Sequence, residues 1–129
     1  MNPLYYDIAF FLQSNGFGTL GSDLFGGEWG GPDKQTLVLE GVATPTDLKN
    51  LYEQPSVQVL VRGDKLEPDY KVYQRAYEIR KFMLSQSENV NVNGCVLKGF
   101  EEGSNIAPLG KDQNERFIYS MNFTTYRGV

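Results

Sequence analysis

The chain has 129 residues, 40% hydrophobic and 22% charged, with eight Phe and eight Tyr, which fits one domain over residues 1–129 and excludes disorder over most of the length. Its net charge of −4 argues against a protein that binds DNA by neutralising phosphates, because that mode requires a basic patch. No apolar run approaches the roughly 20 residues that span a bilayer, we expect no signal peptide, and the single Cys95 predicts a cytosolic or intracellularly assembled protein without internal disulfides.

The first predicted element is a helix over residues 3–14. Asn2 is expected to cap its N-terminus, and Gly16 supplies a C-terminal stop. One apolar stripe follows the helical spacing of three and four residues. It consists of Tyr5, Ile8, Ala9 and Leu12. Phe10 and Phe11 lie off this stripe, so they face either a partner or a second buried side.

A short strand is predicted over Thr19–Phe25, followed by a segment too rich in Gly and Pro for regular structure. This segment, residues 26–34, is called the arm below. We expect the arm to be mobile in the free subunit and ordered only against a partner, because ordering four glycines around Glu28 and Trp29 costs entropy. Phe25 and Trp29 either pack against the domain's own core or anchor another protein.

Two further strands are predicted at residues 36–40 and 56–62. The second is the clearer, because every other side chain is apolar. Its alternating apolar side chains are Val57, Val59 and Val61. Residues 41–55 form a connection broken by Pro45 and Pro55. One helical turn is expected within it, at Leu48, Leu51 and Tyr52.

A second helix is predicted over residues 68–85, beginning at Pro68, whose fixed φ angle suits a helix start. Its apolar face again follows the helical spacing. That face consists of Val72, Ala76, Ile79 and Met83. Tyr73 and Tyr77 are expected to broaden it.

The C-terminal part is predicted to begin with a hairpin of residues 89–92 and 95–100, because Asn93-Gly94 is favoured in tight turns. Residues 101–112 are predicted to be a loop. The last strand, residues 115–126, has one apolar face that we expect to be buried against the second helix. That face consists of Phe117, Tyr119, Met121 and Phe123. Together the elements predict an α+β fold, with a single twisted, mostly antiparallel or mixed β-sheet, two helices packed on it and long Gly-rich loops.

The residue types argue against catalysis. The chain has no histidine, which removes the commonest general base and the commonest zinc ligand. Glu101 and Glu102 are adjacent carboxylates, but such neighbours on a Gly-flanked loop are usually solvated. Gly16–Gly21 matches G-x-G-x-x-G with a helix before it and an extended segment after it, the reverse of a dinucleotide site. We therefore predict no catalytic residue, no cofactor and no metal site.

Three groups of segments together resemble the minor capsid, or tail-terminator, proteins of long-tailed (siphovirus-type) bacteriophages. They are Gly18–Gly26 with Pro32-Asp33, then Pro55–Gly63 with the helix end Tyr77–Arg80, then Pro108–Asp112 with Arg116–Phe123. Their order and spacing cover nearly the whole chain. Gly27–Gly31 departs from the family, whose arm is variable, so details of partner choice do not carry over.

The resemblance implies an α+β subunit of a closed ring, usually of six copies. Such a ring would cap the finished tail tube, stop its growth and join the head connector. DNA would pass through the lumen without specific binding, in a virion neck assembled in the host cytoplasm and away from any membrane. Closed rings need two different patches on each subunit. The candidate partner contacts are Phe25, Glu28, Trp29, Lys34, Glu101, Glu102 and Lys111.

Three alternatives stay open at this point. One is another phage neck or head-tail completion protein. A second is a module that binds a small ligand or a peptide, which a stable monomer at micromolar concentration would favour. The third is an enzyme that works through carboxylates or backbone amides alone.

Overall fold

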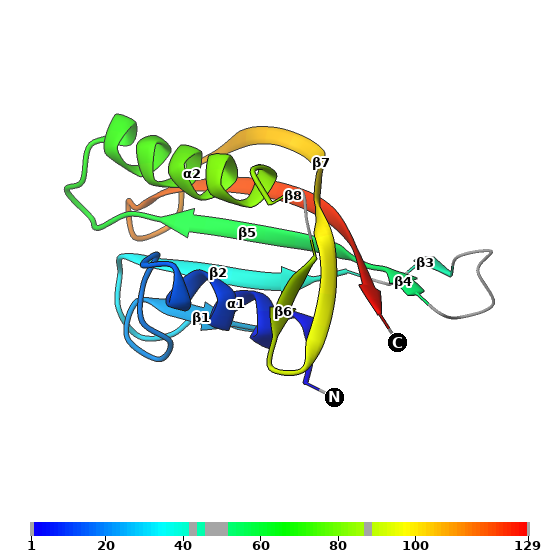
Figure 1. The fold of residues 1–129 in the computed structure, drawn as a ribbon. Coiled ribbons are helices and arrows are strands. Elements are labelled where there is room, and N and C mark those ends of the chain that lie inside the picture. Colours follow the sequence, from blue (N-terminus) through cyan, green and yellow to red (C-terminus); the bar gives the residue numbers. More distant parts are fainter. Residues whose placement is uncertain (1, 42–43, 46–51, 87–88, 129) are drawn as a thin grey trace.

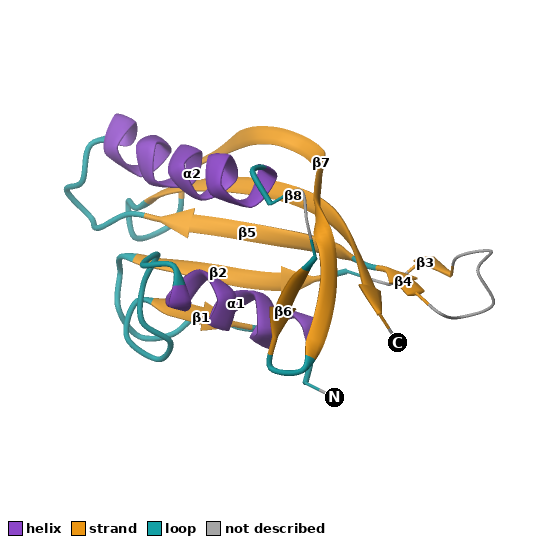
Figure 2. Cartoon of the chain, viewed as in Figure 1, coloured by secondary structure: helices purple, strands orange, loops and turns teal. Residues whose placement is uncertain are grey.

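The computed structural model describes residues 2–41, 44–45, 52–86 and 89–128, which form two helices and a curled sheet (Figure 1). The helices are α1 (Leu4–Ser14) and α2 (Asp69–Leu84). The strands are β1 (Leu24–Gly26), β2 (Gln35–Glu40), β3 (Thr44–Pro45), β4 (Tyr52–Gln54), β5 (Ser56–Arg62), β6 (Val90–Val92), β7 (Cys95–Lys111) and β8 (Phe117–Gly128). This composition of helices and one sheet, coloured in Figure 2, confirms the predicted α+β fold.

Strand β8 is paired along both of its edges. On one side it pairs antiparallel with β5, from Ser56 opposite Thr124 to Arg62 opposite Ile118, and with the short β4 beyond. On the other side it pairs with β7, which carries β6. Beyond β5 lie β2 and then β1, which pairs with β2 in the parallel sense, so the sheet is mixed. Figure 1 shows β7 curving away from α2 so that β6 lies beside α1.

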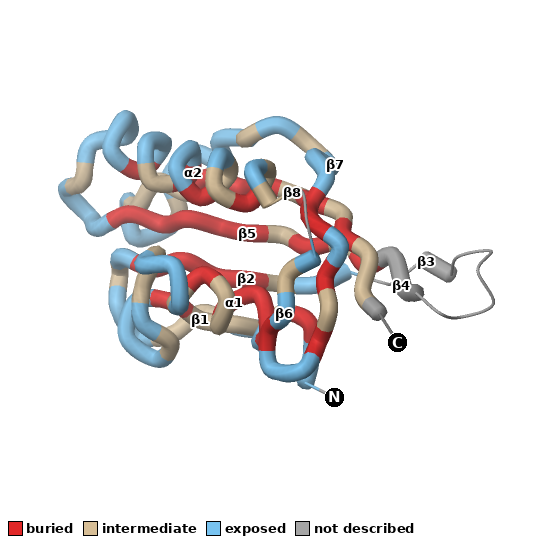
Figure 3. The backbone as a smooth tube through the Cα atoms, in the orientation of Figure 1, coloured by how far each residue is buried: buried red, intermediate tan, exposed pale blue. Residues whose placement is uncertain are grey.

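One hydrophobic cluster joins both helices to a single face of the sheet, seen as the red segments of Figure 3. The periodic side chains predicted to be buried supply most of it. Its members include Ile8, Ala9, Leu12, Val57, Val59, Val61, Val72, Ala76, Ile79, Met83, Tyr119, Met121 and Phe123. Three predicted members are less buried than expected: Phe117 is half-buried against the cluster, and Tyr73 and Tyr77 are exposed on the flank of α2 rather than extending its buried face.

The C-terminal end of α1 is formed as Gly16 predicts. Gly16 takes a φ of +85°, and its N–H donates to the Gln13 carbonyl at 3.1 Å. The Phe17 N–H donates to the Leu12 carbonyl at 3.0 Å. These two bonds are those of a Schellman motif, which needs a left-handed residue after the helix.

At the N-terminal end of α1 the prediction of an Asn2 cap is wrong. Pro3 occupies the capping position, where no side chain makes a capping hydrogen bond. Asn2 instead donates to the Asp7 carboxylate at 3.4 Å, and Asn93 of the β6–β7 turn donates to the same oxygen at 3.1 Å. Asp7 is 1% exposed. A buried carboxylate needs such partners, and it recruits the residue that would otherwise cap.

Two predicted boundaries are also wrong. The strand expected over Thr19–Phe25 is reduced to β1, because the Asp23 carboxylate accepts the Thr19 N–H at 2.7 Å and closes a turn. The loop expected over 101–112 is the second half of β7, paired with β8 through several register shifts. These irregularities accommodate Gly and Pro on an edge strand.

The β6–β7 hairpin is confirmed, with Asn93 and Gly94 both at positive φ as a tight turn requires. In the 41–55 connection, Thr44–Pro45 and Tyr52–Gln54 are strands. Tyr52 is therefore not helical, whereas the expected helical positions Leu48 and Leu51 lie outside the described residues.

Candidate functional site

The described residues contain no group of three or more metal-ligating side chains. None of the described helices is long and apolar enough to cross a membrane. One open pocket of about 540 Å³ lies beside α2, and its lining includes Lys34, Lys71, Arg75 and Glu78. Ligand pockets are usually lined by apolar side chains. The charged lining of this pocket is therefore not typical of a small-ligand site. The denser polar contacts lie at one end of the sheet.

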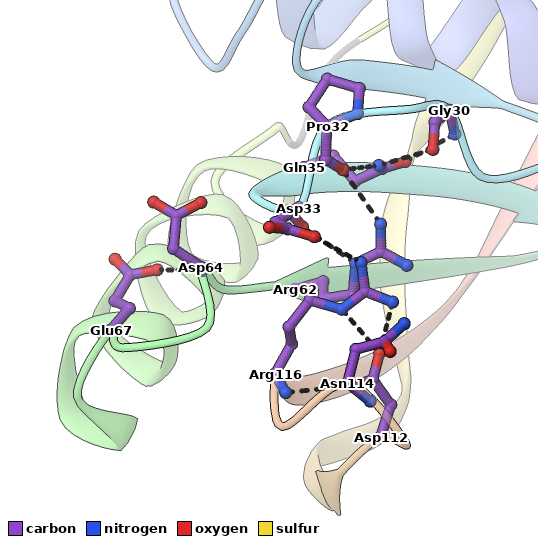
Figure 4. Close-up of polar contacts among 10 residues, drawn as sticks. All are labelled: Gly30, Pro32, Asp33, Gln35, Arg62, Asp64, Glu67, Asp112, Asn114 and Arg116. Atoms are coloured by element: carbon purple, nitrogen blue, oxygen red, sulfur yellow. Dashed lines mark hydrogen bonds and ion pairs between the residues drawn. The ribbon is translucent and has the colours of Figure 1, made fainter.

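Arg62, the last residue of β5, holds the arm to the sheet (Figure 4). Its Nε donates to the Asp33 carbonyl at 2.9 Å and its Nη2 to the Pro32 carbonyl at 3.0 Å. The residue is 5% exposed. Burial, followed by the repulsion of the nearby Arg116 guanidinium, lowers the pKa of Arg62 from its ordinary value.

Arg116 then ties the arm to the turn between β7 and β8. Its Nη1 donates to Asp33 Oδ1 at 2.8 Å, and its Nε and Nη2 contact Asp112 Oδ2 at 2.9 and 2.7 Å. Asp112 Oδ1 accepts the backbone N–H groups of Asn114 and Arg116, both at 3.0 Å. The turn is thus closed by one carboxylate oxygen while the other orients the guanidinium.

The protonation of this pair follows from the contacts. Burial would raise the pKa of Asp112, but the hydrogen bonds from the Arg116 side chain and from two backbone N–H groups outweigh it and leave the pKa below its ordinary value. The hydrogen bond to Asp112 raises the pKa of Arg116. We call Asp33, Arg62, Asp112 and Arg116 the arginine network.

The rest of the arm also packs on its own chain. The Gln35 side chain, 2% exposed, accepts the Gly30 N–H at 2.8 Å and donates to the Gly30 and Pro32 carbonyls. The Arg62 guanidinium carbon lies 4.2 Å from the centroid of the Trp29 ring. These contacts favour the own-domain packing of Trp29 over a free anchor. They also offset the entropy cost that led us to expect an arm ordered only against a partner.

The other predicted contact residues fall into two places. Phe25 lies under the arm, where a Cβ on Gly30 would collide with its ring. Glu28 and Lys34 are exposed on the arm, and Lys111 is exposed with its Nζ 5.0 Å from the ring centroid of Phe117. Lys34 and Lys111 are next to Asp33 and Asp112 in the chain, and Glu28 is next to Trp29.

Glu101 and Glu102 lie elsewhere. They pair with Thr124 and Phe123, whereas Lys111 pairs with Phe117. Seven residues of strand separate Thr124 from Phe117, which is about 23 Å. Glu101 is exposed, and Glu102 forms a 2.7 Å ion pair with Arg80 of α2. The structure therefore does not bring the two groups of predicted contacts together.

The arginine network was missed by the sequence reasoning, although its members stand inside the segments that carry the resemblance. Pro32-Asp33, the end of Pro55–Gly63, Asp112 and Arg116 come from all three groups. A charged residue beside Pro or Gly was the available signal for Asp33 and Arg62, whereas Asp112 and Arg116 have no such neighbour. Only the fold shows that these charges converge.

Comparison with known proteins identifies a family for most of the chain. A family model described as bacteriophage tail terminator protein matches residues 11–126. No curated protein matches the chain. The matched region holds the whole arginine network, the core cluster except its first members, and most of the sheet. Members of such a family are structural components of the virion that associate with other tail or head components. The chain therefore belongs to the bacteriophage tail terminator family.

Proposed function

We propose that this chain is the subunit of a closed ring of six copies that caps the phage tail tube, stops its elongation and joins it to the head connector. The family match over residues 11–126 carries the proposal. The subunit works by contact and not by catalysis. It assembles in the host cytoplasm, and DNA crosses the ring lumen without specific binding.

The arginine network suits one of these contacts. It fixes the arm, the end of β5 and the β7–β8 turn into one surface through hydrogen bonds and ion pairs. Glu28 and Lys34 on the arm, and Lys111 next to Asp112, add exposed charges to that surface. A preformed surface loses little conformational entropy when it binds. We propose that this end of the sheet meets the tube or the connector.

Native mass measurement of the purified protein tests the ring. Six subunits of 14.6 kDa make about 88 kDa. A mass of about 88 kDa, held on dilution to micromolar concentration, is the expected result. A stable monomer that also stays monomeric beside tail tubes would contradict the ring and favour a binding module.

A further inference from the structure

Helix α2 carries a row of exposed tyrosines that its own fold does not cover. Tyr70, Tyr73 and Tyr77 are 59%, 43% and 42% exposed, and they make up half of the large hydrophobic side chains exposed among the described residues. Their spacing places them on one flank of the helix. The rings of Tyr73 and Tyr77 stack, with centroids 6.3 Å apart. Single exposed apolar residues are ordinary, but a contiguous row marks an interaction site.

The sheet has a second surface without a helix on it. Because side chains alternate along a strand, the residues paired between those of the core face point away from both described helices. On β2, β5 and β8 they are Leu37, Leu39, Ser56, Gln58, Leu60, Ile118, Ser120, Asn122 and Thr124. We call this the outer sheet face. None of these side chains is charged. Gln35 and Arg62 pair at the end of this face, where both are buried beneath the arm and Arg62 lies against Trp29.

Leu37, Leu60 and Ser120 are buried and the other members are half-buried, so the outer sheet face is only partly open to water. A face without charged side chains is still unusual for a sheet that meets water. Water-facing sheet surfaces normally carry polar and charged side chains, whereas loss of charge is what distinguishes the centre of a protein interface.

Tyrosine is enriched among the residues that dominate binding energy. Gln58 donates to Ser120 at 3.0 Å and Asn122 donates to Ser104 at 2.9 Å. A tyrosine hydroxyl would donate to the carbonyl oxygens of these two amides.

The two surfaces also match in length and at their rims. Helix α2 has 16 residues and is about 24 Å long, and β5 has 7 residues and spans about 23 Å. Exposed Lys81 follows Tyr77 by one helical turn, and exposed Glu101 pairs with Thr124 at the border of the outer sheet face. Two copies that each carry a net charge of −4 would repel unless neutral patches with opposite rim charges meet.

We propose that the tyrosine row of α2 in one subunit packs on the outer sheet face of the next copy of this chain. The inference rests on the proposed ring and names its contact. Each subunit would offer a helix and receive one, so the contact joins two different patches and repeats from copy to copy. The outer sheet face would then gain the helix layer that sheets ordinarily have.

A matched pair of variants tests whether the tyrosine row stabilises the contact between subunits. Tyr77→Ser removes one ring of the row, and Tyr6→Ser on α1 removes a tyrosine of the same 42% exposure outside it. We expect Tyr77→Ser to raise the concentration at which the ring dissociates by about tenfold or more, and Tyr6→Ser to leave it unchanged. Circular dichroism of both variants verifies that the subunit stays folded. Equal dissociation of the two variants would overturn the proposal.

Photo-crosslinking in assembled tails tests the geometry, whether or not the ring survives purification. Benzoylphenylalanine placed at Tyr77 should join peptides from β5 or the paired part of β8 of another copy, and the same group at Tyr6 should not. Crosslinks from Tyr77 only to other proteins, or none, would refute the contact. If the wild-type protein forms a ring but these crosslinks are absent, the proposed contact is wrong and the proposed function stands. Normal tails made without any of this protein would instead refute the proposed function.

Discussion

Arg116→Ala is expected to destabilise the subunit more than the loss of an ordinary surface arginine. The Arg116 side chain is 12% exposed and contacts Asp112, which is 21% exposed, and Asp33, which is 40% exposed. A hydrogen bond to a charged group contributes about 1.5–3 kcal/mol, but solvent screening reduces the half-exposed Asp33 pair to under about 1 kcal/mol. The variant should therefore lose about 2–3 kcal/mol, most of it from the turn at Asp112.

Urea unfolding measures this loss. With a slope of about 1.5–2 kcal/mol per molar urea, the midpoint should fall by about 1–2 M. Trp29 is the single tryptophan, so its fluorescence follows the arm while far-ultraviolet circular dichroism follows the whole fold. We expect the fluorescence transition of Arg116→Ala to precede the dichroism transition, because the arm loses the ion pair at Asp33 and is then held by fewer contacts than the rest of the fold.

Arg80→Ala is the matched control. Arg80 also forms an ion pair, with Glu102, but the two side chains are 21% and 44% exposed. Its loss should cost less than about 1 kcal/mol. If Arg116→Ala costs no more than Arg80→Ala, and both probes of Arg116→Ala coincide at the wild-type midpoint, the arginine network does not hold the arm and the reasoning fails.

Three further outcomes follow from the structure. Phe123→Ala should cost about 3–5 kcal/mol in thermal or urea unfolding because Phe123 is 1% exposed, and half-buried Phe117→Ala should cost clearly less; the reverse order would show that the core is misplaced. The Tyr119 hydroxyl donates to Asp69 at 2.7 Å, which together with burial raises the pKa of Tyr119 to about 12. Since tyrosine in an unfolded chain titrates near about pH 10, wild-type stability should fall as pH rises from about 10 to 12, and Tyr119→Phe should lack that part of the fall. The pKa of Asp112 is lowered, so its stabilisation is present above about pH 4 and lost as pH falls through its folded pKa; Asp112→Asn should be less stable at neutral pH and less sensitive to acid, and an unchanged acid profile would contradict the assignment.

The periodic elements could be predicted because their signal is local. Alternating valines placed β5 at its observed bounds, and the three-and-four spacing of the α2 stripe selected the residues that are buried. Asn93-Gly94 likewise set the β6–β7 turn. In each case one face of a strand or helix, or one dipeptide, contained the information needed.

The second half of β7 could not be predicted in this way. Gly103, Pro108 and Gly110 oppose a strand when read alone. They are tolerated because β8 offers a paired edge and the register shifts around them. The hydrogen bonds that stabilise this half of β7 come from β8, which lies later in the sequence.

The packing of the arm on its own chain could not be predicted for a similar reason. Its glycines correctly indicate a high entropy cost, but the side chains that hold it come from Gln35 and Arg62, and Arg116 reaches it across 83 residues of sequence. The composition of the arm indicates the entropy cost of ordering it, but it does not indicate these long-range contacts. The three groups of family segments contain the residues of the arginine network, but only the fold shows that these residues meet and hold the arm.

The length of tails assembled without this protein tests the central claim most directly. Electron micrographs of lysates from a phage in which the gene carries an early stop should show tails of uncontrolled length that are not joined to heads, and the wild-type gene supplied in trans should restore uniform, joined tails. Tails of uniform normal length, attached to filled heads in the absence of the protein, would contradict its proposed role as the terminator.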